Sequence, residues 1–415
     1  MLIKAKQLKP CTIDLPLSKS VVNRAIVLEC LYGSKGAIER MEAELSGEEL
    51  CDDIRVMLNV ARQLHTDTDF YVEASGTAMR FSTALMAVTP GTRTITGTPR
   101  LCQRPIAPLV DALRQLGADI QYIGNEGFPP LRITGNPHMQ GGSLSIRGDI
   151  SSQFISALLM IAPTFQNELK LNIEGKLVSK PYIEMTKKMV RSFSLGEDRK
   201  EPERDWSAAA FWYEISLLSG VRFDLKGLST NSVQGDRVCH DIFGKIHDFI
   251  EENITPDGTI RPDAEPFRYD FTECPDLAQA VVVACCMKHV PFHFTGLQTL
   301  RIKETDRIAA LQTELAKLGI AIEVSDREIK ALQPSLTPLK NLKKEKEGNS
   351  PQTELSSLVK EQERQSISTY NDHRMAMAFA PCAIMLGEIE VNDPEVVTKS
   401  YPTFWSDLQK AGFEL

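Results

Sequence analysis

Six times along this 415-residue chain, a short cluster of small polar or charged residues precedes an apolar, alanine-rich segment of roughly three helical turns. Each segment is expected to form a helix buried on most sides, with a Ser, Asp or Asn side chain available to cap its first N–H groups. One such segment would be an ordinary core helix, whereas six indicate a repeated supersecondary unit. The segments begin at Ser18, Ser75, Ser151, Trp206, Pro275 and Asn371.

Two longer stretches, residues 95–120 and 294–322, are similar to each other. In both, a strand-like segment leads through Thr-Gly into an arginine-bearing loop, and an amphipathic helix and a second strand follow. Because one compact core rarely accommodates a chain of this length, the repeats predict an α/β protein of two similar domains, each with about three βα units. The residues that align at one constant offset are Leu109, Leu113, Leu116 and Gly117 with Leu311, Leu315, Leu318 and Gly319.

The polar clusters at the helix starts carry cations, as Lys19 and Arg24 do at the first helix. A helix N-terminus is already partly positive, so cations there are unfavourable unless an anion binds nearby. If the six units share one orientation, their N-termini and cations can meet in one cleft suited to phosphates and carboxylates. The chain as a whole has a net charge of −8, so a cluster of cations would be a local feature of an acidic protein. This negative charge gives no support to nonspecific nucleic-acid binding.

Several classes of protein are disfavoured by the sequence. The nine cysteines include no C-x-x-C pair and no spaced Cys/His cluster, which argues against structural zinc and against a disulfide framework. There is no P-loop motif of the kind found in many kinases. The first residues lack an apolar signal segment, and the longest apolar run, 375–387, is too short to span a bilayer, so a cytoplasmic protein is expected. The Lys/Glu-rich segment at about 336–365 is expected to be a solvated loop.

Nine short motifs occur in an order that covers nearly the whole chain: SKSVVNRA, GTAMR, QRPIAPLVDALRQLGA, ISSQFISALLM, LVSKPYIEMT, PDLAQA, LRIKETDRI, YNDHRMAMAFA and VTKSYPTFW. As an ordered set they resemble the 5-enolpyruvylshikimate-3-phosphate (EPSP) synthase family of enolpyruvyltransferases. The resemblance implies a two-domain inverted α/β barrel, in which each domain has three βαβαββ-type repeats around buried helices. It also implies that residues 19–221 form one domain, and that residues 1–18 and 222–415 form the other.

The resemblance further implies transfer of the enolpyruvyl group of phosphoenolpyruvate to the 5-hydroxyl of shikimate 3-phosphate, with release of phosphate. Family members pass through a tetrahedral intermediate, work in chorismate and aromatic amino acid biosynthesis, and use no metal and no cofactor. The expected partners are therefore two small anionic substrates, with no nucleic acid and no membrane, and the expected state is a monomer. Gly76 is expected to leave room for the inhibitor glyphosate in the phosphoenolpyruvate site.

Matching the motifs residue by residue implies three sets of site residues. The ligands of shikimate 3-phosphate are expected to be Lys19, Ser20, Arg24, Ser151, Ser152, Gln153, Ser179, Tyr182, Asp276 and Lys303. The ligands of phosphoenolpyruvate are expected to be Lys19, Gly76, Arg104, Gln153, Arg307, Arg374 and Lys399. The catalytic groups are expected to be Asp276, which accepts the hydroxyl proton, and Glu304 and Lys19, which serve proton transfer at the methylene carbon.

The sequence also allows alternative interpretations of these residues. Taken singly, Ser151 and Asp276 could be helix caps, and residues 303–307 could be an exposed helix face with paired charges. The related UDP-N-acetylglucosamine enolpyruvyltransferase is a second candidate, disfavoured because Cys102 lies in a different motif from the reactive cysteine of that enzyme. A non-catalytic anion-binding paralogue is a third candidate.

The chain departs from the usual family pattern at three positions. Leu17 stands where glycine is usual, Phe81 where proline is common, and Thr299 where many members have asparagine.

Overall fold

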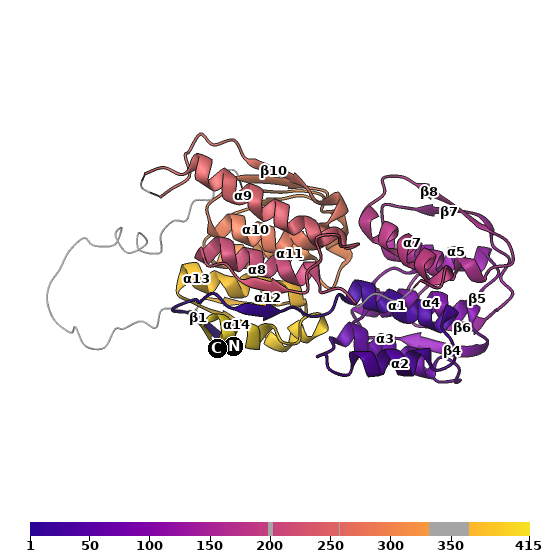
Figure 1. The fold of residues 1–415 in the computed structure, drawn as a ribbon. Coiled ribbons are helices and arrows are strands. Elements are labelled where there is room, and N and C mark those ends of the chain that lie inside the picture. Colours follow the sequence, from indigo (N-terminus) through magenta and orange to yellow (C-terminus); the bar gives the residue numbers. More distant parts are fainter. Residues whose placement is uncertain (198–201, 257, 332–364) are drawn as a thin grey trace, which may run out of the picture.

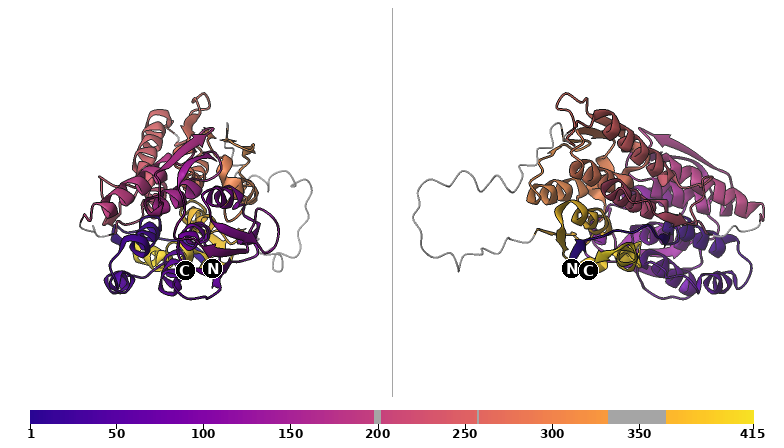
Figure 2. Two further views of the ribbon diagram at one scale, coloured as in Figure 1. Left: turned by 90° about the vertical axis from the view of Figure 1, so that its right-hand side faces the viewer. Right: turned by 60° about the vertical axis from the view of Figure 1, so that its left-hand side comes forward.

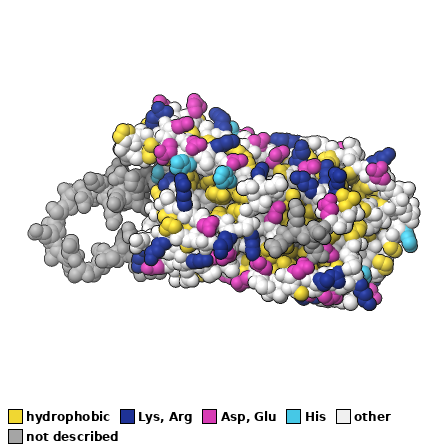
Figure 3. Space-filling model, viewed as in Figure 1, with side chains coloured by type: hydrophobic (Ala, Val, Ile, Leu, Met, Phe, Trp, Pro, Cys, Tyr) yellow, Lys and Arg dark blue, Asp and Glu magenta, His cyan; other side chains and the backbone are white. Residues whose placement is uncertain are grey.

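The computed structural model describes residues 1–197, 202–256, 258–331 and 365–415. Two lobes lie side by side (Figure 1), and both chain termini lie together on the second lobe (Figure 1, Figure 2). The segment at about 336–365, expected to be a solvated loop, lies outside the described residues except for its last residue. On the face in Figure 3, Lys and Arg side chains are interspersed with Asp and Glu over both lobes. None of the helices in the described ranges is long and apolar enough to cross a membrane.

The first lobe surrounds α1 and α4 with two sheets, which lie on opposite sides of these helices in Figure 1. The order in the larger sheet is β3-β4-β6-β5, and β7 pairs in parallel with β8. The helices are α1 (Lys19–Tyr32), α2 (Ala37–Leu45), α3 (Asp52–Gln63), α4 (Gly76–Val88), α5 (Ala107–Gln115), α6 (Ser152–Ile161) and α7 (Lys180–Ser194). The strands are β3 (Phe70–Tyr71), β4 (Gly91–Thr96), β5 (Asp119–Tyr122), β6 (Leu131–Gly135), β7 (Gly142–Arg147) and β8 (Leu169–Glu174).

The second lobe has the same general construction, with sheets of order β14-β15-β1-β16 and β10-β11-β13-β12 and a β2-β9 pair. Its helices are α8 (Trp206–Ser219), α9 (Cys239–Asn253), α10 (Ala278–Met287), α11 (Arg307–Lys317), α12 (His373–Phe379), α13 (Ala383–Leu386) and α14 (Phe404–Ala411). Its strands are β1 (Leu2–Ala5), β2 (Thr12–Asp14), β9 (Asp224–Lys226), β10 (Phe267–Asp270), β11 (Phe292–Thr295), β12 (Glu323–Val324), β13 (Ile329–Ala331), β14 (Ser366–Ile367), β15 (Glu388–Val391) and β16 (Phe413–Glu414). Short 3-10 helices include η5 (Pro275–Leu277) and η6 (Gln298–Ile302).

The chain begins in the second lobe and then crosses into the first. Strand β1 pairs antiparallel with β15, with Ile3 opposite Ile389, and β2 pairs in parallel with β9. Leu15 packs in the core of the second lobe, whereas Leu17 packs in the core of the first. The crossing therefore lies just before α1.

All six polar-then-apolar segments form helices, and they are buried as expected. Every residue of α10 is buried, and so is every residue of α4 except Thr77, because small and apolar side chains let other elements pack on all sides. Ser75, Ser151 and Asp205 each accept a hydrogen bond from a backbone N–H in the first turn of the helix that follows. Ser18 makes no such side-chain cap, so the expected capping holds for some of the segments and not for the first.

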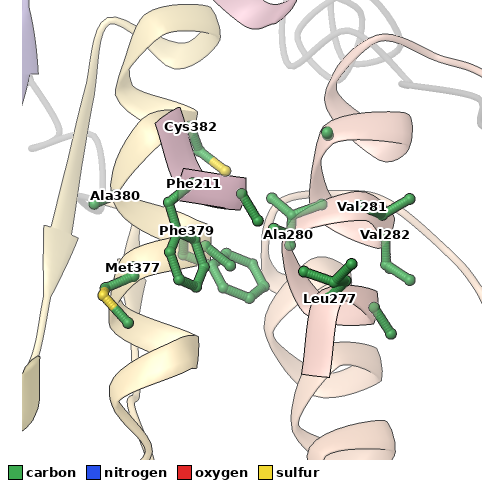
Figure 4. Packing of buried hydrophobic residues seen from close by; sticks show 14 of the residues in the cluster. Phe211, Leu277, Ala280, Val281, Val282, Met377, Phe379, Ala380 and Cys382 are labelled. Atoms are coloured by element: carbon green, nitrogen blue, oxygen red, sulfur yellow. The ribbon is translucent and has the colours of Figure 1, made fainter. Parts of the chain in front are cut away.

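Each lobe has its own hydrophobic core. Figure 4 shows part of the second core, where Phe211 of α8, Leu277 of η5 and Phe379 of α12 pack together. Helix α8 thus packs with the second lobe, although the family pattern implied a crossing near residue 222. The domain limits stay a prediction, and we propose from this packing that the second crossing lies between α7 and α8.

Candidate active site

A pocket between the lobes is lined by residues of α1, α4, α6 and α7 from the first lobe and by residues of η5, η6, α11 and α12 from the second. All of the expected shikimate 3-phosphate ligands line it, and so do all of the expected phosphoenolpyruvate ligands except Lys399. Lys399 lies directly behind the wall, because its Nζ is 2.6 Å from the Ala74 carbonyl oxygen and 3.8 Å from Oε1 of Glu304. The fold therefore brings the predicted residues together, although they come from segments far apart in the sequence.

The N-termini of α4 and α6 meet at this pocket. Their first residues line it, and Nε2 of Gln153 donates a hydrogen bond to the Thr77 hydroxyl at 3.0 Å across the two helix starts. Gly76 lies beside two guanidinium groups, since a Cβ at this position would be 2.7 Å from Nη1 of both Arg80 and Arg104. Two helix N-termini and two guanidinium groups thus face the same space, as expected of an anion-binding site.

Asp276 is the central carboxylate of the second lobe. Its Oδ1 accepts a hydrogen bond from Nη1 of Arg307 at 2.8 Å and lies 3.2 Å from Nζ of Lys303, and its Oδ2 lies 3.8 Å from Nη2 of Arg374. Burial alone would raise the pKa of this carboxyl, but the three cations outweigh burial and hold the pKa well below its ordinary value. Asp276 is therefore ionised and able to accept a proton.

Glu304 is also held as a carboxylate. Its Oε2 accepts a hydrogen bond from Nη2 of Arg307 at 2.9 Å, and its Oε1 lies 3.5 Å from Nη1 of Arg104. Burial would raise the pKa of Glu304, but Arg307, Arg104 and Lys399 hold it well below the ordinary value. In this state Glu304 can accept a proton and has none to donate.

Lys19 pairs with Asp53, a residue that the sequence did not single out. The Lys19 Nζ is 2.8 Å from Oδ2 of Asp53, and the Lys399 Nζ is 3.7 Å from Oδ1. Burial lowers the pKa of Lys19, but the opposing effects, of which the Asp53 carboxylate is the largest, raise the pKa above its ordinary value. Lys19 therefore keeps its proton and is the better placed proton donor of the expected catalytic groups.

Asp372 organises the arginines of the second lobe. It caps α12 by accepting a hydrogen bond from the Arg374 backbone N–H at 2.9 Å, and it accepts another from Nε of Arg307 at 2.7 Å. The Arg307 side chain is 1% exposed and contacts three carboxylates, which rules out the exposed helix face considered from the sequence. Arg374 reaches the same region, because its Nη1 donates to the Asp276 carbonyl oxygen at 2.9 Å.

Two further buried acids lie beside the pocket and were not predicted as site residues. Asp236 is 2% exposed and accepts a hydrogen bond from the Tyr182 hydroxyl at 3.2 Å and another from the Ser207 hydroxyl. Burial, with a smaller contribution from Asp276, raises its pKa to about 6. Asp205 lines the pocket and caps α8, and burial raises its pKa as well. Their local sequence resembles an ordinary helix start, so no signal pointed to a site.

His373 and Cys102 behave differently from these charged groups. His373 lines the pocket, and within the described ranges neither ring nitrogen has a hydrogen-bond partner. Burial and the nearby cations Lys19 and Arg374 hold the pKa of His373 well below its ordinary value, so the ring is neutral. Cys102 does not line the pocket, and its Sγ donates to the Gly97 carbonyl oxygen at 3.5 Å.

Comparisons with known proteins agree on one family. A family model described as EPSP synthase (3-phosphoshikimate 1-carboxyvinyltransferase) matches residues 66–408. The 3-phosphoshikimate 1-carboxyvinyltransferase of Bacteroides fragilis (strain YCH46) is 42% identical over 99% of this chain and 98% of that protein. The protein of the same name from Haemophilus influenzae (strain ATCC 51907) is 32% identical over 96% of each chain.

A solved structure of similar fold is the EPSP synthase of Acinetobacter baumannii, with a TM-score of 0.64. The two chains share 19% sequence identity, and the match covers 100% of this chain and 99% of the other. This likeness bears on the fold, which agrees with the expected two-domain α/β architecture.

Proposed function

The chain belongs to the EPSP synthase (3-phosphoshikimate 1-carboxyvinyltransferase) family, and we propose that it transfers the enolpyruvyl group of phosphoenolpyruvate to the 5-hydroxyl of shikimate 3-phosphate. The single observation that supports this assignment best is the pocket between the lobes, where many cations converge around the ionised Asp276. Two substrates that together carry two phosphates and two carboxylates need such a concentration of positive charge. The family match does not favour the UDP-sugar enzyme.

The proposed ligands divide the pocket between the substrates. The residues assigned to the shikimate 3-phosphate side come mostly from the first lobe, whereas Arg307, Arg374 and Lys399 on the phosphoenolpyruvate side come from the second. Binding both substrates would therefore hold the lobes together and exclude water from the reacting atoms. The pocket would hold the two substrates close together and in a fixed orientation, which accounts for a large part of the rate gain in two-substrate reactions.

We assign the proton transfers to three side chains. Lys19 would protonate the methylene carbon of phosphoenolpyruvate, while the hydroxyl oxygen attacks the adjacent carbon and its proton passes to Asp276. The resulting tetrahedral intermediate would then lose phosphate and a methyl proton, which Glu304 would accept, to regenerate the enol ether. The ionisation states support these roles, because Lys19 keeps its proton and both carboxylates are free to accept one.

The substrates would also tune the base. In this structure the cations that lower the pKa of Asp276 pair with carboxylates of the protein. Substrate phosphates and carboxylates would compete for those cations, and a carboxylate that loses cationic partners becomes a stronger base. The proposed site is thus charge-compensated before the substrates bind and is activated when they arrive.

Both sets of proposed ligands come from one chain, so we also propose that the enzyme works as a monomer. The cytoplasm stays its expected location.

The test of the function is a phosphate-release assay with phosphoenolpyruvate and shikimate 3-phosphate. Release that requires both substrates is expected, and no release is expected when UDP-N-acetylglucosamine replaces shikimate 3-phosphate. Absence of two-substrate release would refute the assignment and would leave the non-catalytic paralogue.

A further inference from the structure

Three buried arginines around the pocket, Arg104, Arg307 and Arg374, each pair with a carboxylate. Arg80 lies instead over the ring of Phe154, with 5.3 Å between the guanidinium carbon and the ring centroid. The charge of Arg24 is compensated in a similar way. The residue is 2% exposed, and within the described part of the chain it forms no ion pair with a carboxylate. Its guanidinium carbon instead lies over two aromatic rings, 5.1 Å from the ring centroid of Phe81 and 5.9 Å from that of Tyr182. These distances fall within the range of cation–π attraction, which is stronger for a desolvated cation.

Hydrogen bonds fix the plane of this guanidinium from three sides. Its Nε donates to the Thr186 hydroxyl at 2.7 Å, its Nη2 to the Ser156 hydroxyl at 3.1 Å, and its Nη1 to the Ser20 carbonyl oxygen at 2.7 Å. A longer contact of 3.5 Å joins Nη2 to the Tyr182 carbonyl oxygen. A guanidinium has five N–H donors, so the contacts with the described residues leave one Nη1 hydrogen unused, beside Ser20 in the pocket wall.

Phe81 could be regarded as an ordinary core residue, because its side chain is fully buried and packs in the core of the first lobe. The same side chain also lines the pocket and lies under Arg24. A leucine at this position would fill most of the core volume but would present no π face to the guanidinium. The packing role and the electrostatic role of Phe81 can therefore be separated by substitution.

We propose that Phe81 is a positioning residue, whose ring face holds the Arg24 guanidinium so that its unused Nη1 hydrogen points at an anionic group of shikimate 3-phosphate. This inference rests on the proposed function and adds a residue that the family pattern did not assign to the site. Burial lowers the pKa of Arg24 to about 10, so the group remains a cation at neutral pH and the two rings compensate part of its desolvation. An anionic group of shikimate 3-phosphate would compensate the rest of the cost of burying the Arg24 charge.

The most direct test replaces Phe81 by mono-, di- and trifluorinated phenylalanine. Successive fluorines weaken the negative face of the ring while its shape stays nearly constant, so the affinity for shikimate 3-phosphate should fall stepwise. Binding of shikimate 3-phosphate alone, measured by calorimetry, gives this affinity without turnover. Constant affinity across the series would overturn the role of Phe81, whereas absence of binding to the unmodified protein would overturn the proposed function as well.

Phe81→Leu provides a second readout with a matched control. The KM for shikimate 3-phosphate should rise about tenfold, as expected for loss of a buried cation–π contact, while the KM for phosphoenolpyruvate and kcat change little. Phe70→Leu removes a ring from the same core but outside the pocket, and it should leave both KM values unchanged. In an Arg24→Lys background, Phe81→Leu should have a smaller effect. A uniform loss of activity, shared by Phe70→Leu, would reduce Phe81 to a packing residue.

Discussion

Arg307 donates a hydrogen bond from Nη1 to Oδ1 of Asp276 at 2.8 Å. The proposed phosphoenolpyruvate ligand and the proposed base of the reaction are thus paired with each other. A buried ion pair of this kind holds both charges in a low-dielectric site, where each would otherwise be costly. A phosphate or carboxylate arriving at Arg307 would compete with Asp276 for the positive charge of this guanidinium, which would make Asp276 more basic when the substrate is in place.

Replacing the proposed base should abolish most turnover while the fold is kept. Asp276→Asn preserves shape but removes the proton acceptor, so kcat should fall by a factor of about 10²–10⁴. Loss of the competing carboxylate should leave the KM for phosphoenolpyruvate unchanged or lower it. Steady-state kinetics checks both values, with the exposed Asp326→Asn as the control. Near-normal kcat in Asp276→Asn would remove the assigned role.

The Lys19–Asp53 pair should control the alkaline limb of the pH–rate profile. Asp53 raises the pKa of Lys19 against the effect of burial, so Asp53→Asn should lower that pKa and move the alkaline loss of activity to lower pH. The neighbouring Asp52→Asn is the matched control, because Asp52 contacts Thr398 and Arg55 and not Lys19. Profiles of kcat/KM test this, and an alkaline limb that does not move would exclude Lys19 as the donor.

Gly76→Ala should weaken phosphoenolpyruvate binding selectively. A methyl group would lie 2.7 Å from Nη1 of both Arg80 and Arg104, so the flexible guanidinium ends would have to shift. Losing one charge-assisted hydrogen bond should raise the KM for phosphoenolpyruvate about tenfold and weaken inhibition by glyphosate in parallel. Gly47→Ala, where a Cβ would meet no atom within 4 Å, is the control. Equal changes for both substrates would point to a general disturbance of the lobe.

An exposed arginine links the two lobes beside the pocket. Arg100 donates hydrogen bonds to the carbonyl oxygens of Glu304 at 3.0 Å and Lys303 at 3.2 Å. Arg100→Ala should raise both KM values by about fivefold, in line with roughly 1 kcal/mol for such a contact, and expand the ligand-free protein in small-angle scattering. Adding both substrates should make the Arg100→Ala protein compact again. Arg132 is an exposed arginine on β6, and Arg132→Ala should change neither the KM values nor the scattering of the ligand-free protein. Scattering that is identical with and without substrates would contradict lobe closure.

Asp236 should make stability depend on pH in a defined window. Its pKa is raised from 3.8 to about 6 in the folded protein, so between these values the folded state binds more protons than the unfolded state. The free energy of unfolding contributed by this group therefore falls as pH rises from about 4 to 6, by about 3 kcal/mol in all. Asp236→Asn should remove this component, so its stability relative to wild type should increase over that window. Denaturant unfolding of both proteins measures it, and a constant difference would contradict the raised pKa.

The parts of the fold that follow from local pattern could be predicted from the sequence. The six helices were predictable because apolar periodicity and polar starts are local properties. An anion-binding pocket was predictable because the cations lie at these helix starts. The partner of Lys19 could not be predicted in the same way. Asp53 lies in the first turn of α3, where an acidic residue is ordinary because it favours the helix dipole. Its contact with Lys19 depends on how α1 and α3 pack, which no local pattern encodes.

Local sequence patterns also do not show that α8 packs with the second lobe or that Arg307 is buried. The helix from Trp206 resembles the other buried helices, so its sequence alone did not reveal which of the two cores it joins. Arg307 follows Asp306 at a helix start, and its spacing from Lys303 fits an exposed charged face equally well. Only the contacts with Asp276 and Asp372, on other elements, make it a buried residue.

The most direct test of the proposed activity is identification of the products by phosphorus NMR during turnover with phosphoenolpyruvate and shikimate 3-phosphate. Inorganic phosphate and 5-enolpyruvylshikimate 3-phosphate should appear in equal amounts while both substrates disappear, and Asp276→Asn should form neither product at a comparable rate. Phosphate that appears without the enolpyruvyl product, or unchanged spectra with the wild-type protein, would refute the proposed activity.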